Sequence, residues 1–351
     1  MENVTTPTTN STDLYEKFWW LAPKYFKELS SRPKYLVAIE SSIMVIITIS
    51  AFFGNSLVCL TLVRNPRLRT ATNLLILMLA ATDMLTACLP LTVATVVLIK
   101  GKWIVEVNPF DVKNFPCQFQ GIIAPALAGF SLHIMALTAI NRYICVVRQR
   151  LYNQLFSRKA TCLVILVDGM IILSLTSISY PAGFAKITLD PRRAMCFTTF
   201  LQPKSSQVIA TMFLIINVAI PMSLITFSYY RVFKKIRSSS FQVAMINLKT
   251  SDSPQSTTTT TTSKIQEVKI TKTVFAVLLG YLTCWIPVIV CDNLSFNMTN
   301  PRFPRQGELV FTYFFSLSSA INPFIYGTTS RALRKELWAT IYHCKKKNRA
   351  T

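Results

Sequence analysis

Two carboxylates lie deep inside long apolar stretches of this sequence, at Asp83 and Asp168. An ionised carboxylate in apolar surroundings is costly unless it meets a cation, a proton or hydrogen-bond donors. Three more apolar stretches contain polar or kinking residues, in Asn141-Arg142-Tyr143, Cys284-Trp285-Ile286-Pro287 and Asn322-Pro323-Phe324-Ile325-Tyr326. Polar groups in such places indicate a functional role, such as binding an ion or a ligand.

The sequence lacks the motifs of the common enzyme classes. It has no glycine-rich phosphate loop, no zinc-binding spacing and no nucleophile elbow, and only 9 of its 351 residues are glycine. His133 has no second histidine or thiolate pair at a metal-binding spacing, so we expect it to be satisfied at a helix interface. The sequence predicts a protein that is not an enzyme and has no cofactor, apart from a sodium ion considered below.

Seven apolar segments must position these residues. The sequence is 51% hydrophobic and only 15% charged, and a helix needs roughly 20 mostly apolar residues to cross a hydrocarbon core about 30 Å thick. The sequence therefore predicts an all-α membrane protein, a seven-transmembrane helix bundle followed by a short amphipathic cytoplasmic helix. The seven segments lie at 41–63, 71–99, 121–147, 160–185, 206–233, 273–291 and 309–329.

The basic residues predict how the bundle is oriented. Of the 37 Lys and Arg residues, 23 lie on the side of the first, third and fifth connections and the C-terminus. By the positive-inside rule this side is cytoplasmic and the N-terminus is extracellular. Topology and contact with anionic lipid account for the net charge of +22, so no nucleic acid partner is expected. Three glycosylation sequons lie on the predicted outer side, at Asn3, Asn10 and Asn297.

These boundaries divide the chain into an extracellular segment (1–40), the bundle (41–329) and a cytoplasmic tail (330–351). The connection at about 238–264 is predicted to be disordered, because its Ser- and Thr-rich stretch cannot bury enough apolar surface to fold. Cys344 lies next to three lysines and is predicted to carry a palmitoyl chain. The amphipathic helix of the tail has one apolar stripe, formed by Leu333, Leu337, Trp338 and Ile341.

Besides Cys344, two cysteines lie outside the apolar segments, at Cys117 and Cys196. Both fall on the predicted outer side, where an oxidising compartment allows a disulfide. Such a bond would clamp the loop between the fourth and fifth helices over the mouth of the bundle.

Together these features resemble the rhodopsin-like G-protein-coupled receptors. The resemblance covers residues from about 41 to 343 and implies a plasma-membrane receptor that binds an extracellular ligand and activates a heterotrimeric G protein. Arrestin and membrane lipid are further partners that it implies. Besides the three motifs and the two cysteines, it rests on Gly54-Asn55, Leu79-Ala80-Ala81-Thr82-Asp83, Trp103, Pro221 and Tyr229.

Within this family the sequence is similar to the melatonin receptors. Asn141 stands where most family members have Asp, and the similarity continues in Leu189-Asp190-Pro191-Arg192, Cys196-Phe197-Thr198 and Tyr229-Tyr230-Arg231. The similarity implies coupling to the inhibitory class of G protein. Departures from the subfamily argue against melatonin itself as the ligand: Asn217 replaces His, Ala182 replaces Asn, and Pro323 replaces Ala.

The resemblance assigns roles to three groups of residues. The ligand cavity is formed by Ala124, Ala128, Gln202, Asn217, Trp285, Val288, Ile289, Thr312 and Ser316. A sodium site at mid-membrane is formed by Asp83, Ser131, Ser318 and Asn322, with Asn55 adjacent. Activation and G-protein coupling involve Asn141, Arg142, Tyr143, Tyr229, Glu267, Pro287, Pro323 and Tyr326.

One expectation concerns how Arg142 is held. In similar receptors this arginine bridges to an acidic residue at the end of the sixth helix, here Glu267, in the resting state. Because Asn141 cannot form the adjacent ion pair that Asp would, we expect Arg142 to be held less firmly.

The sequence leaves alternatives open both for the ligand and for the class of function. Mostly apolar cavity walls favour a small, weakly polar ligand. A transporter or channel that uses Asp83 and Asp168 is a different class of function. Ala124 stands where an amine receptor has a carboxylate, and Ser316 stands where an opsin has its retinal-binding lysine. A peptide ligand is the alternative within the family, binding near Arg192, Arg193, Arg302 and Arg305.

Overall fold

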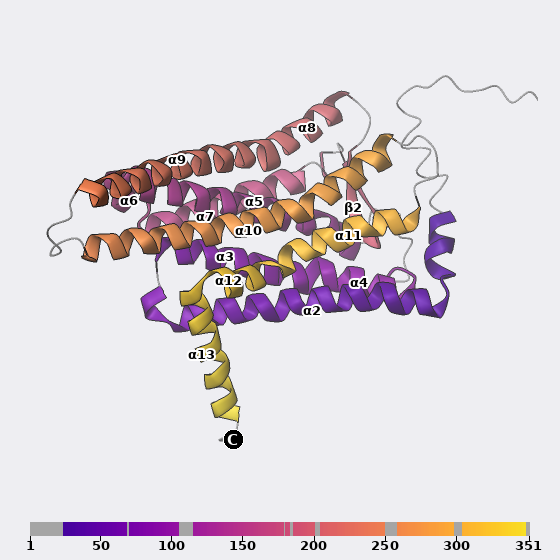
Figure 1. The fold of residues 1–351 in the computed structure, drawn as a ribbon. Coiled ribbons are helices and arrows are strands. Elements are labelled where there is room, and N and C mark those ends of the chain that lie inside the picture. The colour runs from indigo at the N-terminus through magenta and orange to yellow at the C-terminus, as the bar shows by residue number, and fades with distance from the viewer. Residues whose placement is uncertain are drawn as a thin grey trace, which may run out of the picture.

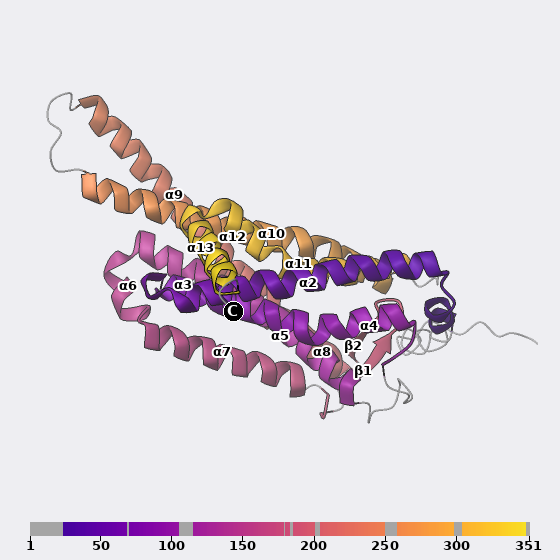
Figure 2. The same cartoon turned by 90° about the horizontal axis from the view of Figure 1, so that it is seen from below.

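Long helices run side by side in a bundle, and a small two-stranded sheet covers one of its ends (Figures 1 and 2). The computed structural model describes residues 24–68, 70–104, 115–178, 180–182, 185–200, 204–249, 258–297 and 304–348. The helices are α2 (Lys34–Arg64), α3 (Ala71–Thr86), α4 (Thr92–Lys100), α5 (Phe115–Val147), α6 (Gln149–Leu155), α7 (Arg158–Ile178), α8 (Lys204–Leu214), α9 (Ile220–Lys249), α10 (Thr258–Asn297), α11 (Arg305–Ala320), α12 (Asn322–Thr329) and α13 (Arg331–Asn348). The strands β1 (Ala185–Asp190) and β2 (Met195–Phe200) pair antiparallel as a hairpin. We call the end of the bundle that carries this sheet the hairpin end and the opposite end the α13 end.

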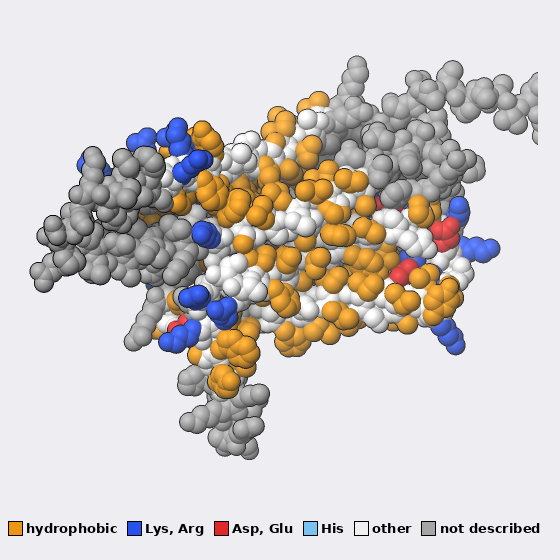
Figure 3. Space-filling view, in the orientation of Figure 1, with side chains coloured by type: hydrophobic (Ala, Val, Ile, Leu, Met, Phe, Trp, Pro, Cys, Tyr) orange, Lys and Arg blue, Asp and Glu red, His pale blue; other side chains and the backbone are white. Residues whose placement is uncertain are grey.

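Six segments of the described chain are long and apolar enough to cross a membrane. They are α2, α3 with α4, α5, α7, the part of α8 and α9 at Thr211–Ser238, and the part of α10 at Ile270–Cys291. Helices α11 and α12 together make a seventh segment, bent by 42°. Apolar side chains cover the middle of the bundle surface, whereas Lys and Arg lie toward its ends (Figure 3). The predicted seven-helix bundle is confirmed, and the chain is a multi-pass membrane protein.

Three of the crossing segments contain a break in the regular helix. The π-helical turn η2 (Ala87–Leu91) joins α3 to α4 and contains Pro90, which has no N–H to donate. A second π-helical turn, η3 (Ile215–Ala219), joins α8 to α9. Pro323 stands in the first turn of α12 and packs against Gly54, where a Cβ would lie 3.0 Å from the proline ring. The absence of a side chain at Gly54 therefore lets α2 approach the bend closely.

The fourth crossing helix is shorter than the predicted segment 160–185. α7 ends at Ile178, shortly before Pro181, and the residue before a proline disfavours helical backbone. Strand β1 then begins at Ala185. Part of the segment expected to cross the membrane is therefore a turn and the start of the hairpin.

The connection between α9 and α10 is more helical than predicted. α9 continues to Lys249 and α10 begins at Thr258, so helix covers both sides of residues 250–257 within the region 238–264 that was predicted to be disordered. Those eight residues lie outside the described part of the chain. Extending an existing helix needs no new nucleus, and residues 238–249 contain neither Gly nor Pro.

Helix α13 leaves the bundle at a steep angle and packs against the end of α2 (Figure 1). Asn65 Nδ2 donates a hydrogen bond to Glu336 Oε2 at 2.8 Å. Leu333 and Leu337 are buried against the bundle, whereas Trp338 is exposed. The helix therefore presents one apolar side to the protein and an aromatic side chain to its surroundings.

Candidate functional site

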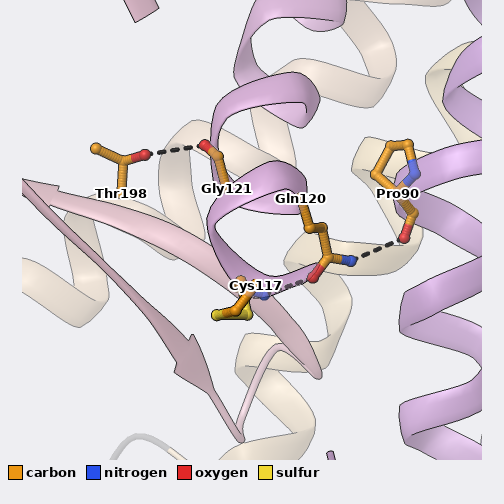
Figure 4. The surroundings of a disulfide bond; sticks show 6 residues. Pro90, Cys117, Gln120, Gly121 and Thr198 are labelled. Atoms are coloured by element: carbon orange, nitrogen blue, oxygen red, sulfur yellow. Dashed lines mark hydrogen bonds between the residues drawn. A yellow bond between two sulfur atoms is a disulfide. The ribbon is translucent and has the colours of Figure 1, made fainter. Parts of the chain in front are cut away.

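A disulfide and one glutamine fasten the hairpin to the bundle (Figure 4). Cys117 in α5 is bonded to Cys196 in β2, with the Cα atoms 5.3 Å apart, so the disulfide that the sequence allowed is present. Gln120 Nε2 donates to the Pro90 carbonyl at 2.9 Å, and Gln120 Oε1 accepts from the Cys196 N–H at 2.8 Å. Gln120 thus joins three elements, and no local sequence signal marks it, because its partners are distant in the chain.

Strand β1 lies against the start of α5 because Gly121 has no side chain. A Cβ at Gly121 would lie 2.3 Å from Ile187 Cγ2. Thr198 Oγ1 of β2 donates to the Gly121 carbonyl at 2.9 Å (Figure 4). The hairpin is therefore held at a fixed distance above the bundle.

Hairpin residues pack into the region where the ligand cavity was predicted. Ala194 and Met195 belong to the same buried apolar cluster as Ala124 and Val288. Thr312 Oγ1 donates to the backbone carbonyl of Arg193 at 2.7 Å. The predicted cavity residues that are buried are Ala124, Asn217, Val288, Thr312 and Ser316.

Trp285 lies at the base of this region. Its ring stacks on Tyr281, with centroids 5.4 Å apart, and meets the edge of Phe315 at 6.1 Å. Trp285 packs against both large apolar clusters of the bundle, one toward each end. Trp285 therefore joins the apolar clusters of the two halves of the bundle.

The remaining predicted cavity residues are less buried or lie outside the described part of the chain. Ile289 is 50% exposed, and its assignment to the cavity stays a prediction. One residue along a helix turns the side chain by about 100°, and the inward position is the neighbouring Val288. Ala128 is only half buried, and its carbonyl accepts from the Tyr281 hydroxyl at 3.5 Å. Gln202 lies outside the described residues.

Two arginines of the hairpin turn pair with two carboxylates. Arg192 Nη2 lies 2.9 Å from Asp190 Oδ2, and Arg193 Nε lies 2.8 Å from Glu308 Oε2. Burial alone would lower the pKa of Arg192, but its hydrogen bond with Asp190 and the charges of Asp190 and Glu308 together raise it. Both arginines therefore stay charged, and each is already neutralised by the protein.

A second ion-pair group joins the start of α2 to α11. Glu40 accepts from both Arg32 and Arg305, and all three side chains are buried. Arg302, the fourth arginine of the proposed peptide site, lies outside the described residues. The three described arginines of the proposed peptide site are all paired with carboxylates of this chain, and a peptide ligand stays an alternative.

Asp83 is buried at mid-bundle, as its position in an apolar segment predicts. Asn322 Nδ2 donates to Asp83 Oδ2 at 2.8 Å, and Ser319 also hydrogen-bonds to this carboxylate. Asn55 Nδ2 donates to the Ser319 carbonyl at 2.9 Å. Ser318, predicted to belong to this group, donates instead to the Phe315 carbonyl at 2.7 Å. Ser319 takes its place, since these adjacent residues on α11 point in different directions.

The oxygen atoms near Asp83 suit a small hard cation. Asn55 Oδ1 and Asn322 Oδ1 are buried acceptors with no hydrogen-bond partner among the described residues. Oxygen ligands are those that hard cations prefer. Ser131, on α5, is buried, but no contact with Asp83 is described for it. The amide oxygens and the carboxylate together fit the predicted sodium ion.

Arg142 is held inside the bundle at the α13 end. Its guanidinium is only 2% exposed and donates to Asn141 Oδ1 at 2.6 Å and to Thr72 Oγ1. Thr72 Oγ1 in turn donates to Asn141 Oδ1 at 2.8 Å. The amide oxygen of Asn141 therefore accepts hydrogen bonds from both Arg142 and Thr72. That Asn141 holds Arg142 less firmly than an Asp would stays a prediction. The side chain of Glu267 lies outside the described residues, so its pairing with Arg142 stays a prediction.

Two tyrosines border a small cavity above Arg142. Tyr229 and Tyr326 are both buried and line a space of about 10 Å³, which is about the volume needed for one water molecule. The Tyr229 hydroxyl has no hydrogen-bond partner among the described residues. Tyr143, next to Arg142, packs edge-on against Phe227 with ring centroids 5.6 Å apart.

Two prolines lie in the helices that lead to this end. Pro287 lies within the continuous helix α10, and Pro323 lies at the bend between α11 and α12. Each removes one backbone hydrogen bond from its helix.

Asp168, for which the sequence offered no role, pairs with His133. Asp168 Oδ1 lies 2.8 Å from His133 Nδ1, and His133 Nε2 lies 3.2 Å from the Ile216 carbonyl. A carbonyl can only accept, so Nε2 donates to it, and Nδ1 forms the second hydrogen bond, with Asp168. His133 is thus satisfied at a junction of α5, α7 and η3, as predicted.

Comparisons with known proteins agree with this geometry. Residues 54–326 match the sequence model of the family described as "7 transmembrane receptor (rhodopsin family)". The chain is 26% identical over 338 residues to melatonin receptor type 1A of Ovis aries, which covers 94% of this chain and 85% of the relative. It is 26% identical over 315 residues to melatonin receptor type 1B of Mus musculus, with coverage of 88% and 79%. The crystal structure of squid rhodopsin superposes with a TM-score of 0.74 at 18% identity, over 91% of this chain and 89% of that one.

Proposed function

Because this chain belongs to the rhodopsin family of seven-transmembrane receptors, we propose that it binds a small extracellular ligand with a weakly polar body and activates the inhibitory class of heterotrimeric G protein. It is a G-protein-coupled receptor of the melatonin-receptor-like type, not an enzyme. The ligand class rests on the walls of the region above Trp285. They are apolar at Ala124 and Val288, with hydroxyls at Thr312 and Ser316 as the polar anchors.

The G-protein class is inferred from the relatives, which are melatonin receptors at about a quarter identity. The coupling face is the α13 end, where Arg142 binds Thr72 and Asn141 and lies near Tyr229. Release of Arg142 and outward movement of α10 about Pro287 would open a cleft ringed by basic residues. That cleft suits an amphipathic helix with a negative carboxyl end. Arrestin is a further proposed partner of the same face.

Two features of the α13 end complete the proposal. In the resting receptor Arg142 also pairs with Glu267, and Glu267→Ala is then expected to raise basal nucleotide exchange. If basal nucleotide exchange is unchanged at an equal amount of receptor on the cell surface, Glu267 does not restrain Arg142, and the restraint comes from Thr72 and Asn141. Helix α13 lies on the inner membrane surface with Trp338 in the lipid, and Cys344 carries a palmitoyl chain.

The N-terminus is proposed to be extracellular at the plasma membrane, with glycans at Asn3, Asn10 and Asn297. The disulfide between Cys117 and Cys196 supports this orientation, since disulfides form on the oxidising side. Treatment of the cell-surface protein with a peptide N-glycosidase should lower its apparent mass, and the triple Asn→Gln variant should not shift. A variant that still shifts would move the glycans elsewhere.

Sodium is proposed as an allosteric ion at Asp83, held by the carboxylate and the amide oxygens of Asn55 and Asn322. An ion there would balance the buried negative charge of Asp83 and connect α2, α3 and the bend of α11 and α12. Chain atoms already satisfy part of the site through Asn322 Nδ2 and Ser319.

The alternative classes find less support. Asp83 lies inside the bundle against Asn322, whereas Asp168 pairs with His133 between other helices, so the two carboxylates do not line one transport path.

The decisive experiment is ligand screening on the reconstituted receptor with purified G proteins. Indoles, lipids and peptides would be tested for stimulation of guanine-nucleotide exchange. Substrate flux through the protein without any exchange would overturn the receptor assignment.

A further inference from the structure

The turn of the hairpin carries a guanidinium group into a built recess. The Arg193 side chain is 5% exposed, although it lies on a connection between two strands. Its Nε donates to Glu308 Oε2 at 2.8 Å, and the carboxylate of Glu308 is completely buried. A fully buried carboxylate at the start of α11 needs a positive partner. In this structure Arg193 is that partner.

Aromatic rings form two walls of the recess. The guanidinium carbon of Arg193 lies 4.1 Å from the ring centroid of Phe311 and 4.9 Å from that of Phe197. The two rings meet edge-on at 5.5 Å. Planar cations with delocalised charge bind favourably over aromatic faces. The recess thus has one buried carboxylate and two aromatic faces, which suits a flat monocation.

The charge balance of the turn makes the recess selective for a cation. Arg192 is held mainly by Asp190, through hydrogen bonds of 3.1 and 2.9 Å to its two oxygens. Arg192 Nη1 also lies 3.1 Å from Glu308 Oε1, but that oxygen has no properly aligned hydrogen-bond partner among the described residues. The two arginines neutralise the two carboxylates. If Arg193 leaves, one negative charge is left at Glu308.

The recess lies at the edge of the proposed ligand cavity. The carbonyl of Arg193 accepts from Thr312, a predicted cavity residue. The next residue, Ala194, has a φ of 54°, in the left-handed region that a non-glycine residue rarely adopts. The hydrogen bond to Thr312 and the burial of Ala194 hold the turn in this conformation.

We propose that Glu308, Phe197 and Phe311 form a cation subsite, which the guanidinium of Arg193 occupies in this structure. A ligand with a guanidinium or amidinium group on an apolar stem binds there by displacing the Arg193 side chain. This inference rests on the proposed ligand cavity for its role and adds a charged head to a ligand with an apolar body. The apolar stem would point toward Thr312, Phe315 and Trp285.

The test is a direct binding measurement on the purified full-length receptor, without G protein. Butylguanidinium is the probe, and butylurea, which has the same shape and no charge, is its matched control. The Arg193→Ala variant opens the recess and leaves Glu308 without its partner. Butylguanidinium should raise the thermal unfolding midpoint of this variant in a saturable way, whereas butylurea should not. Wild type should need a concentration higher by about tenfold or more, because Arg193 must first be displaced.

Further variants separate this subsite from general effects of guanidinium. Arg148→Ala removes an exposed arginine at the α13 end and should respond as wild type does. Adding Glu308→Gln to Arg193→Ala should abolish the response, since the neutral amide keeps the shape and loses the charge. If Arg193→Ala does not fold, Arg193→Gln serves the same purpose.

Each outcome decides something. Equal effects of butylguanidinium and butylurea on Arg193→Ala, or a response that survives Glu308→Gln, would overturn the subsite. An equal response in wild type and Arg193→Ala would overturn the claim that Arg193 occupies the subsite. A receptor that binds butylguanidinium as expected but catalyses no nucleotide exchange with any G protein would overturn the proposed function and leave the subsite standing.

Discussion

Asp83 and Asp168 are both aspartates inside the apolar bundle, but their hydrogen-bond partners differ, so they are expected to bind different groups. Asp83 accepts hydrogen bonds from Asn322 and Ser319, close to amide oxygens that have no donor. Asp168 is hydrogen-bonded to His133. A sodium ion is therefore expected to depend on the first carboxylate and to be indifferent to the second.

Thermal unfolding of the purified receptor tests this difference without a ligand. Replacing choline with sodium at constant ionic strength should raise the unfolding midpoint of the wild type, because an ion that binds only the folded state stabilises it. Asp83→Asn should erase the rise. Asp168→Asn, the matched control, should retain it. A sodium effect of equal size in Asp83→Asn would place the ion elsewhere.

Thr72 is the hydroxyl that links Arg142 to Asn141. Thr72→Val keeps the shape of the side chain and removes both hydrogen bonds of the hydroxyl. A hydrogen bond to a charged group contributes about 1.5–3 kcal/mol, so basal nucleotide exchange should rise several-fold at equal receptor amount. Thr72→Ser, which keeps the hydroxyl, should stay near wild type. Equal exchange in both variants would mean that Thr72 does not restrain Arg142.

Sequence reasoning identified residues that stand out from their neighbours in the chain. It missed residues whose partners are distant in the chain. The intramembrane carboxylate, Arg142 and the tyrosines stand out locally, because polar groups are rare in apolar segments. Thr72 acts through a residue 69 positions away, and nothing near it in the chain signals this. The sequence assigned Ser318 to the Asp83 group, whereas the structure places its neighbour Ser319 there, one residue along the helix. Apolar segments of near-uniform hydrophobicity do not define the inward face to better than that.

Among the elements, the crossing helices were predictable and the hairpin was not. Length and hydropathy locate a transmembrane helix, because the bilayer sets both. The hairpin depends on contacts with α5, α11 and a disulfide that spans 79 residues. The extension of α9 and α10 into the polar connection was missed for a related reason. The composition of that connection does not show that it continues a helix that has already formed.

The disulfide between Cys117 and Cys196 is expected to be essential for the hairpin. Removing a native disulfide costs roughly 2–5 kcal/mol, and here it also releases the loop that covers the cavity. Cys117→Ala or Cys196→Ala should abolish ligand binding or surface expression, measured by flow cytometry on intact cells. Cys88→Ala, at an exposed cysteine outside any disulfide, is the control. Normal surface amount and binding in both disulfide variants would contradict this role.

The fit between α5 and β1 can be tested at one glycine. Gly121→Ala would place a Cβ against Ile187, and overpacking of this kind costs about 1–3 kcal/mol. The unfolding midpoint should fall. At Gly327 nothing lies within 4 Å of an added Cβ, so Gly327→Ala should be neutral or slightly stabilising through its helix propensity. An unchanged midpoint in Gly121→Ala would show that the hairpin shifts freely.

Across the whole molecule, the two ends have different chemistry and are connected through the middle. The hairpin end holds buried ion pairs around Glu40 and Glu308, and the α13 end holds Arg142 among hydrogen-bonding groups. Trp285 contacts the apolar clusters of both halves. Pro90, Pro287 and Pro323 lie along the helices between them. This arrangement fits a receptor in which a ligand at one end changes how the other end holds Arg142.

The most direct test of this account is guanine-nucleotide exchange by the receptor reconstituted in lipid nanodiscs with inhibitory, stimulatory and calcium-mobilising G proteins in turn. We predict measurable basal exchange on the inhibitory class, higher exchange for Thr72→Val, and loss of exchange for Arg142→Ala in a receptor that unfolds at the wild-type temperature. Exchange on the other classes alone would contradict only the proposed coupling. Exchange by Arg142→Ala at the wild-type rate, or no exchange by any variant with any class, would contradict the central claim that Arg142 couples this receptor to a G protein.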